Sequence, residues 1–343
     1  MVMAEQSDWT IDDAERVYGV KRWGAGYFEI GANGNLKITP DLSNKNMRID
    51  FQSVIDEIKQ EGIQFPVVVR FHDILRSQVA ALNKTFINTI EEAQYQGKYM
   101  GVYPVKVNQM REVVEEIVDA GAPFNYGLEA GSKAELITVM AYNTNIDSLT
   151  ILNGYKDAEF MRLALLGRKL GRKMIVVIEK YSELSLLVNA AKQLDVMPII
   201  GLRSKMTVKG RGKWESSGGD RAKFGLTTSE MICAARYLES EGMGECLKLL
   251  HFHIGSQLTD IRAVKEAISE GGRIYAEMHR MGFKLEYVDV GGGLGIDYDG
   301  SKSTNDSSRN YTMEEYVADV VYGMREVCDL EGVPHPTLVS ESG

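Results

Sequence analysis

A lysine among apolar residues is the most chemically suggestive position in this sequence. Lys106 stands in the segment VYPVKVNQ, where valine, tyrosine and proline surround a single cation. Burial disfavours the ammonium form and lowers the pKa of a lysine, which leaves a neutral amine able to attack an aldehyde carbonyl. We therefore expect a lowered pKa and a nucleophilic role for Lys106. The alternative is that its ammonium group extends past the strand end into solvent.

A histidine offers a flat ring at the end of another apolar segment, LLHFHIGSQ. His253 lies nearest the end of this segment, with Ser256 just after it, and we expect the imidazole to stack over a planar ligand. His251 alternates with His253, so both side chains should point to the same face of a strand. A two-histidine metal site would need a third ligand and an open position, and no Cys or HExxH partner accompanies them.

A glycine run and a glutamate complete a set of four chemical functions. The run from Asp289 to Gly295 offers backbone amides that can hold a phosphate, with a tight turn as the alternative. It is not a dinucleotide fingerprint, because Ile296 stands where the third glycine is required. Glu341 could keep a pyridine nitrogen protonated, which makes the ring electron-withdrawing. An amine, a stacking ring, a phosphate cradle and a carboxylate match the four parts of pyridoxal phosphate.

Short apolar segments that alternate with helical patterns carry these residues. We expect eight strands, namely YMGVYPVKV, FNYGLEA, SLTILNG, KMIVVIE, MPIIGLRS, KLLHFHIGS, EYVDVGG and TLVSES. The α/β rhythm over roughly 240 residues predicts a (β/α)8 TIM barrel, with a doubly wound sheet as the alternative. The polar and glycine residues at the strand ends are Lys106, Glu129, Asn153, Glu179, Arg203, His253, Ser256, Gly291, Gly292, Gly293 and Glu341. In a barrel they meet at the face where active sites lie.

The N-terminal part predicts a separate small β element. An Asn33-Gly34 pair within WGAGYFEIGANGNLKITP is a strong hairpin signal. We therefore divide the chain into an N-terminal segment with a β-hairpin, residues 1–75, and a barrel, residues 76–343. Two polar, glycine-containing stretches, 204–225 and 297–310, predict long loops. Because no covering helix follows the last strand, we expect a truncated chain and a second β domain that is mostly missing.

Composition excludes several classes of partner. The 343 residues carry a formal net charge of −9, which disfavours nucleic acid as a partner. No apolar run of about 18 residues or signal core occurs, so we expect a cytoplasmic protein without a membrane partner. The three cysteines are widely spaced and form neither a zinc motif nor a disulfide framework.

The ordered series of motifs resembles one family over nearly the whole chain. WGAGYFEI, YPVKVNQ, GLEAGSKAEL, GKWESSGGDRAKFGL, LLHFHIGSQ and YVDVGGGLGIDYDG resemble segments of the biosynthetic arginine decarboxylases of bacteria and plants, which have an alanine-racemase-like barrel. The resemblance implies that Lys106 bears pyridoxal phosphate and that His253 stacks on its ring. It implies that Glu341 pairs with the pyridine nitrogen. The other cofactor-binding residues expected are Ser256, Gly291, Gly292, Gly293, Arg203 and Glu129.

The same resemblance implies a reaction and its partners. L-arginine would lose CO2 to give agmatine, the first step from arginine toward the polyamines putrescine and spermidine. The expected substrate-binding stretch comprises Tyr287, Val288, Asp289, Val290, Gly291, Gly292, Gly293, Leu294, Gly295, Ile296 and Asp297. Magnesium is expected as a second cofactor, and a homo-oligomer would complete its sites across subunits. A decarboxylase of ornithine, lysine or diaminopimelate and a catalytically silent regulatory homologue are the alternatives.

Overall fold

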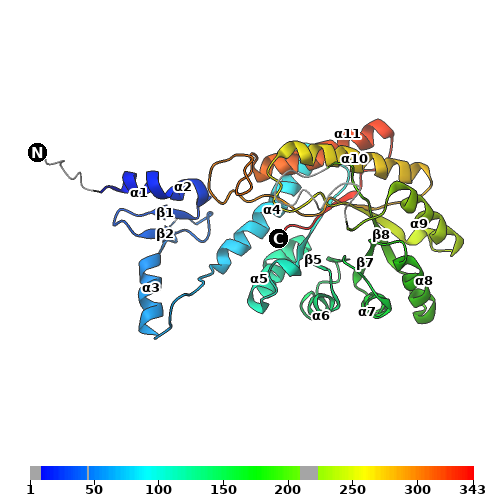
Figure 1. Ribbon diagram of the computed structural model, residues 1–343, viewed down its shortest axis with the longest axis horizontal. Helices are drawn as coiled ribbons and strands as arrows, with labels where there is room; N and C mark the ends of the chain where they lie inside the picture. The colour runs from blue at the N-terminus through cyan, green and yellow to red at the C-terminus, as the bar shows by residue number, and fades with distance from the viewer. Residues whose placement is uncertain (1–8, 45, 209–222) are drawn as a thin grey trace, which may run out of the picture.

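Eight parallel strands close into a barrel in the computed structural model, which describes residues 9–44, 46–208 and 223–343 (Figure 1). Every predicted segment contributes one strand, and β11 closes the barrel by pairing with β4. The barrel prediction is therefore confirmed over the doubly wound alternative. The strands are β4 (Tyr99–Pro104), β5 (Gly127–Ala130), β6 (Leu149–Leu152), β7 (Lys173–Ile178), β8 (Ile199–Arg203), β9 (Leu247–His251), β10 (Tyr287–Asp289) and β11 (Thr337–Ser340).

Helices cover the outside of the barrel and bury their apolar faces against it. Several begin at side chains that accept a hydrogen bond from an amide in the first turn, such as Ser132, Asp157 and Thr227, which fixes where the strand-to-helix loops end. The covering helices are α4 (His72–Glu92), α5 (Arg111–Gly121), α6 (Lys133–Tyr142), α7 (Ala158–Lys169), α8 (Glu183–Leu194), α9 (Thr228–Ser240), α10 (Ile261–Arg280) and α11 (Met313–Glu331).

The interior of the barrel changes from apolar to polar along the strands. Its apolar part contains Val102, Leu149, Ile151, Ile175, Val177, Leu249 and Val339. Because strand side chains alternate between two faces, the residue two positions later points the same way. Those later residues include Asn153, Glu179, His251 and Glu341, all buried. One end of the barrel is thus closed by hydrocarbon, and the carboxyl ends of the strands carry a polar layer.

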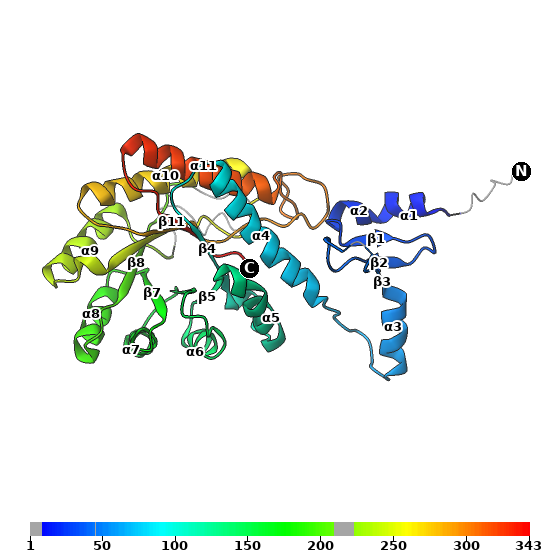
Figure 2. The ribbon, with the colours of Figure 1, turned by 180° about the vertical axis from the view of Figure 1, so that it is seen from behind.

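The N-terminal residues form a small unit beside the barrel (Figures 1 and 2). The predicted hairpin is confirmed, because β1 (Phe28–Ile30) and β2 (Leu36–Ile38) pair antiparallel around the Asn33-Gly34 turn. A two-residue third strand, β3 (Ile49–Asp50), was too short to predict. The helices of this unit are α1 (Ile11–Tyr18), α2 (Val20–Trp23) and α3 (Phe51–Gln60). The boundary predicted at 75/76 falls within the first turn of α4 and stays a prediction.

The N-terminal unit contacts two elements near the carboxyl ends of the strands. The Tyr27 hydroxyl lies 2.9 Å from the Ser77 hydroxyl of α4 and accepts a hydrogen bond from Gln78. A Cβ at Gly300 would lie 2.4 Å from the Cβ of Arg22, so the loop after β10 packs closely on α2.

The two predicted long loops have different outcomes. Residues 297–310 contain no helix or strand, as predicted, and the Asp297 carboxylate accepts a hydrogen bond from Ser308 at 2.6 Å. Most of the stretch 204–225 lies outside the described residues. None of the described helices combines the length and apolar character that spanning a membrane requires.

Candidate active site

A cavity of about 630 Å³ opens at the carboxyl ends of the barrel strands. It is lined by six of the predicted cofactor-binding residues, which are Lys106, His253, Ser256, Gly292, Gly293 and Glu341. Apolar side chains from the start of α4 and from the loop after β10 form part of the walls, among them Leu75, Val79 and Ile296. Residues far apart in the sequence are therefore brought together around one space of a size typical of ligand pockets.

Lys106 projects into this cavity from a short 3-10 turn, Val105–Val107, that follows β4. Its side chain is 53% exposed, and its Nζ lies 3.2 Å from Oε2 of Glu129. Burial favours the neutral amine, but the charges of Glu129 and Glu341 outweigh it and raise the pKa of Lys106. The predicted lowering of this pKa is therefore wrong. The apolar neighbours in the sequence do not enclose the amine, which instead reaches carboxylates on other strands.

Glu129 is fully buried on β5 and is the partner of Lys106. Its Oε1 also accepts a hydrogen bond from Nδ2 of Asn153 at 3.0 Å. Burial, together with the neighbouring charge of Glu341, raises the pKa of Glu129 to about 7, although Lys106 acts in the opposite direction. Glu129 can thus exchange a proton near neutral pH.

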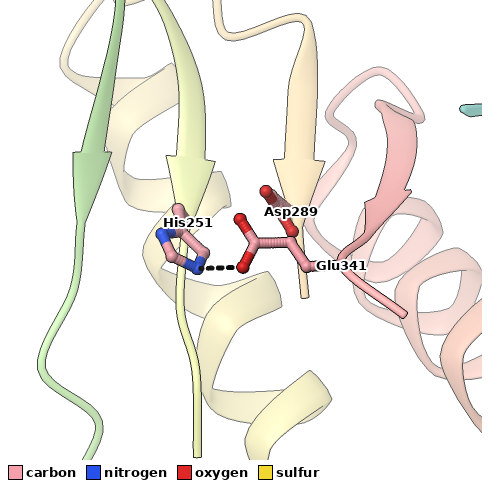
Figure 3. A group of neighbouring side chains, drawn as sticks. All are labelled: His251, Asp289 and Glu341. Carbon is pink, nitrogen blue, oxygen red and sulfur yellow. Dashed lines mark ion pairs between the residues drawn. The ribbon is translucent and has the colours of Figure 1, made fainter. Parts of the chain in front are cut away.

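Glu341 lies directly after β11 and is a buried residue of the cavity wall. Its Oε1 accepts a hydrogen bond from Asn153 at 2.6 Å, and its Oε2 is 3.9 Å from Nε2 of His251. Figure 3 shows the Glu341 carboxyl group between His251 and Asp289. Burial and the nearby Asp289 raise the pKa of Glu341 well above its usual range.

His253 is held as a neutral ring at the cavity wall. Its Nδ1 accepts a hydrogen bond from the amide of Gly255 at 3.0 Å, which fixes the orientation of the imidazole. Burial, with the cations Arg203 and Lys106 nearby, lowers the pKa of His253 to about 3. A neutral ring in a fixed orientation is suited to lie against a flat ligand.

The glycine run is needed because three backbone segments approach one another closely at the mouth. A Cβ at Gly292 would lie 2.3 Å from the carbonyl oxygen of Glu341, and one at Gly293 would lie 2.0 Å from that of Gly255. Gly293 also has a φ of +100°, which disfavours other residues. Within the described part of the chain, the amides of Gly292 and Gly293 donate to no acceptor. Their N–H groups are therefore free to bind an anion.

Other predicted residues lie away from the cavity surface. Arg203 Nη1 is 2.7 Å from Oε1 of Glu179, which is buried in the polar layer. Tyr287 packs in the apolar half of the barrel, and Val288 and Val290 face the core beneath the helices. The Gly291 amide donates to Asp289, and the Gly295 amide donates to the hydroxyl of Tyr311. Of the predicted substrate-binding stretch, Gly292, Gly293, Leu294 and Ile296 reach the cavity.

Sequence reasoning did not identify His251 and Asp289 as neighbours of Glu341. One ligand atom from each of the three lies within 4.8 Å of the others, and all three residues are buried. Their positions could have been predicted from alternation, because His251 precedes His253 by two residues and Asp289 precedes Gly291 by two. Magnesium prefers an octahedral set of oxygen ligands that includes several waters. This buried group with an imidazole does not fit magnesium, and it is the one group of this kind in the described ranges.

Comparison with known proteins identifies the family of this chain. The model of the pyridoxal-dependent decarboxylase family, pyridoxal binding domain, matches residues 75–343. The biosynthetic arginine decarboxylase of Rhodopirellula baltica is 48% identical over 98% of this chain and 50% of its own length. That of Bacteroides thetaiotaomicron is 47% identical over 98% of this chain and 53% of its own. The chain thus spans about half the length of these curated relatives.

Solved structures agree with these sequence matches. The biosynthetic arginine decarboxylase SpeA from Campylobacter jejuni matches with a TM-score of 0.85 and 33% identity, over 95% of this chain and 52% of that one. A diaminopimelate decarboxylase from Helicobacter pylori, complexed with L-lysine, has a TM-score of 0.61 at 21% identity over 77% of this chain and 61% of its own, which shows a shared fold. The resemblance to the arginine decarboxylases is confirmed, and the chain belongs to the pyridoxal-dependent decarboxylases.

Proposed function

We propose that this chain holds pyridoxal phosphate in the barrel cavity and forms the cofactor-binding part of an arginine decarboxylase. The observation that carries the proposal is the convergence of Lys106, His253, Gly292, Gly293 and Glu341 on one cavity. Each suits a different part of the cofactor. Lys106 would bond to its aldehyde, His253 would lie against its ring, and Glu341 would face the pyridine nitrogen. Ser256 and the free glycine amides would bind its phosphate.

The residues around Lys106 explain how it becomes reactive. Lys106 is charged in the structure and must lose a proton before it can attack an aldehyde. Glu129 contacts its ammonium group, and the pKa of Glu129, raised by burial to about 7, suits it to accept that proton. Asn153 donates to both Glu129 and Glu341 and so keeps the two carboxyl groups apart and in fixed positions.

The remaining residues orient the ligand and hold charge. When bound, pyridoxal phosphate supplies an electron-withdrawing ring that accepts the electron pair left by the departing carboxylate. Glu341 holds a proton at the pyridine nitrogen, which strengthens that withdrawal. His253 restricts the ring to one plane. Apolar side chains of α4 form one wall beside these groups.

The substrate we propose is L-arginine, with agmatine and CO2 as products that feed polyamine synthesis. The support is the name shared by relatives that match 98% of this chain. Among the described residues that line the cavity, Glu341 is the one carboxylate, and it faces the ring. We therefore propose that the acid that binds the guanidinium group comes from a further domain or from the partner in a cytoplasmic homo-oligomer. Magnesium has no part in this proposal.

Reductive labelling tests the cofactor site. The chain is mixed with pyridoxal phosphate and reduced with borohydride, and the modified lysine is mapped by mass spectrometry. We expect the label on Lys106 and its loss in Lys106→Ala. Lys180→Ala is the matched control, because Lys180 also follows a barrel strand but does not line the cavity. A label on another lysine, or none in a folded sample, would contradict the proposal.

Release of CO2 tests the substrate. The chain is assayed with arginine, ornithine, lysine and diaminopimelate, both alone and joined to the further residues present in its longer relatives. Arginine should be the preferred substrate. Preference for another amino acid would overturn the choice of substrate and leave the cofactor site standing. Normal labelling without decarboxylation of any substrate, even in the longer protein, would favour a silent homologue.

A further inference from the structure

Two buried carboxyl groups near the cavity lack a cation of their own. Asp289 and Glu341 are both buried, and each offers an oxygen atom within 4.8 Å of the other. The two other acids of the polar layer are paired, Glu129 with Lys106 and Glu179 with Arg203. Two adjacent carboxylates in a dry interior repel each other and lose their hydration, so ionising both is unfavourable.

The hydrogen bonds around these carboxyl groups leave one carboxyl oxygen of Asp289 without a donor. Asn153 donates to Oε1 of Glu341, and the Gly291 amide donates to Oδ1 of Asp289. Oδ2 of Asp289 has no donor among the described residues. Its carboxyl group lies beside that of Glu341 (Figure 3). Two ionised carboxylates have no hydrogen to share, so these neighbouring groups can form a hydrogen bond only when one of them is protonated.

His251 does not supply the missing positive charge. It is fully buried, and neither of its ring nitrogens has a hydrogen-bond partner within the part of the chain that the structure describes. Burial, with Arg203 and His253 nearby, lowers the pKa of His251 well below its usual value. The imidazole is therefore neutral, and its Nε2 lies 3.9 Å from Oε2 of Glu341.

We infer that Asp289 and Glu341 form a carboxyl pair that keeps one shared proton, and that Asp289 is a positioning residue for Glu341. With one proton the pair carries a single negative charge, which matches the single positive charge of a protonated pyridine nitrogen. The shared proton is held by residues of this chain and does not require a bound cofactor. The role of Asp289 toward the ring rests on the proposed function.

Other charged and titratable groups face the pair from the elements around it. They are Tyr99 of β4, Lys106 after β4, Glu129 of β5, Glu179 after β7, Arg203 of β8, His251 and His253 at the end of β9, and Tyr316 of α11. Each of the two cations contacts an acid outside the pair. The nearest uncharged donor is Asn153, which serves Glu341 rather than Asp289.

Infrared spectroscopy of the chain without added cofactor tests the shared proton directly. A protonated carboxyl group has a carbonyl stretch separate from the bands of ionised carboxylates. At neutral pH, the difference spectrum between the original chain and Asp289→Asn should show loss of that band, because an asparagine amide replaces the shared proton as donor. Glu341→Gln should lose the same band, which provides a second variant if the first does not fold.

The control is Asp319→Asn, which removes a partly buried carboxyl group on α11 that pairs with Lys265 outside the barrel. No comparable loss is expected there. Absence of the band loss in both Asp289→Asn and Glu341→Gln would overturn the inference. Loss in Glu341→Gln alone would also overturn it, because the proton would then belong to Glu341 without Asp289.

A cofactor experiment tests the positioning role separately. Asp289→Asn should retain labelling of Lys106 and leave KM nearly unchanged. Its kcat should fall because the shared proton is lost, but only moderately, because the Asn amide can still donate a hydrogen bond to Glu341. Asp289→Ala should lower kcat further, by about tenfold relative to Asn, because no donor remains. Equal kcat values for Asn and Ala would overturn the positioning role. Failure of labelling in the original chain would instead refute the proposed function and leave the infrared result intact.

Discussion

The two halves of the barrel interior are built from the same strands but differ in polarity and in their contribution to stability. In the half near the strand starts, Ile151, Val177 and Leu249 pack together without polar atoms. Two residues later along the chain stand Asn153, Glu179 and His251, which are buried but polar. The apolar half stabilises the fold by removing hydrocarbon from water. The polar half costs stability, since buried ionisable groups must be paired or neutralised.

This contrast shows how one scaffold can separate folding from chemistry. A change in the apolar half should alter the free energy of unfolding and leave the site chemistry intact. A change in the polar half should alter proton positions and catalysis, and it should change stability chiefly through pH. Four substitution experiments test this separation.

The largest effect is expected at Lys106, in the polar half. Lys106→Ala removes the amine that would bond to the cofactor, so activity should fall by at least about a thousandfold. The fold should survive, because the Lys106 side chain is half exposed. Decarboxylation rates and circular dichroism check both statements. Activity close to that of the original chain would remove Lys106 from the proposed mechanism.

The next effect belongs to the apolar half. Ile151→Ala should destabilise the chain by about 2–5 kcal/mol, because the side chain is fully buried and its removal leaves a cavity. Urea unfolding measures this loss. Ile146→Ala, at a 60% exposed isoleucine, is the control and should change stability by less than about 0.5 kcal/mol. Loss of Lys106 labelling in folded Ile151→Ala would show that the two halves are not separable.

Glu341→Gln should separate chemistry from binding within the polar half. The expected fall in decarboxylation rate is about a hundredfold, since a neutral amide cannot stabilise charge on the ring nitrogen. Cofactor affinity should change much less, because the bond to Lys106 and the phosphate contacts remain. Rates and a titration of the lysine–cofactor absorbance measure the two quantities. Equal losses in both would make Glu341 a structural residue.

The smallest effect is a change in how stability depends on pH. Burial, reinforced by Asp289, raises the pKa of Glu341 from 4.5 to about 8. The folded chain therefore keeps a proton that the unfolded chain releases, and this stabilisation is complete below about pH 4.5 and is lost as the pH rises through about 8. In the chain without cofactor, Tm should fall by a few degrees between about pH 6 and about pH 9.

Glu341→Gln should flatten this decline, because glutamine does not titrate. Glu159→Gln, at an exposed carboxyl group on α7, is the control and should keep the original pH dependence. A decline of the same size in Glu341→Gln and in the original chain would show that other groups of the polar layer cause it.

Much of the architecture could be predicted from local patterns. All eight strands, the Asn33-Gly34 hairpin and the loop at 297–310 follow from alternation, helical periodicity and turn residues, which act over a few neighbouring positions. Lys106, His253 and Glu341 were also predicted, because polar residues at the carboxyl ends of parallel strands converge in a barrel. The two-residue strand β3 was beyond such patterns, since its pairing depends on β2.

The sequence by itself determined the barrel, the face that carries the cavity and eight of the residues that line it. Only the tertiary structure decided the charge state of those residues. The apolar neighbours of Lys106 predicted a lowered pKa, yet carboxylates on other strands raise it. Likewise, Asp289 and Glu341 meet only because β10 and β11 are adjacent. Desolvation and Coulomb energies depend on distances in space, and those distances join residues that lie far apart in the chain.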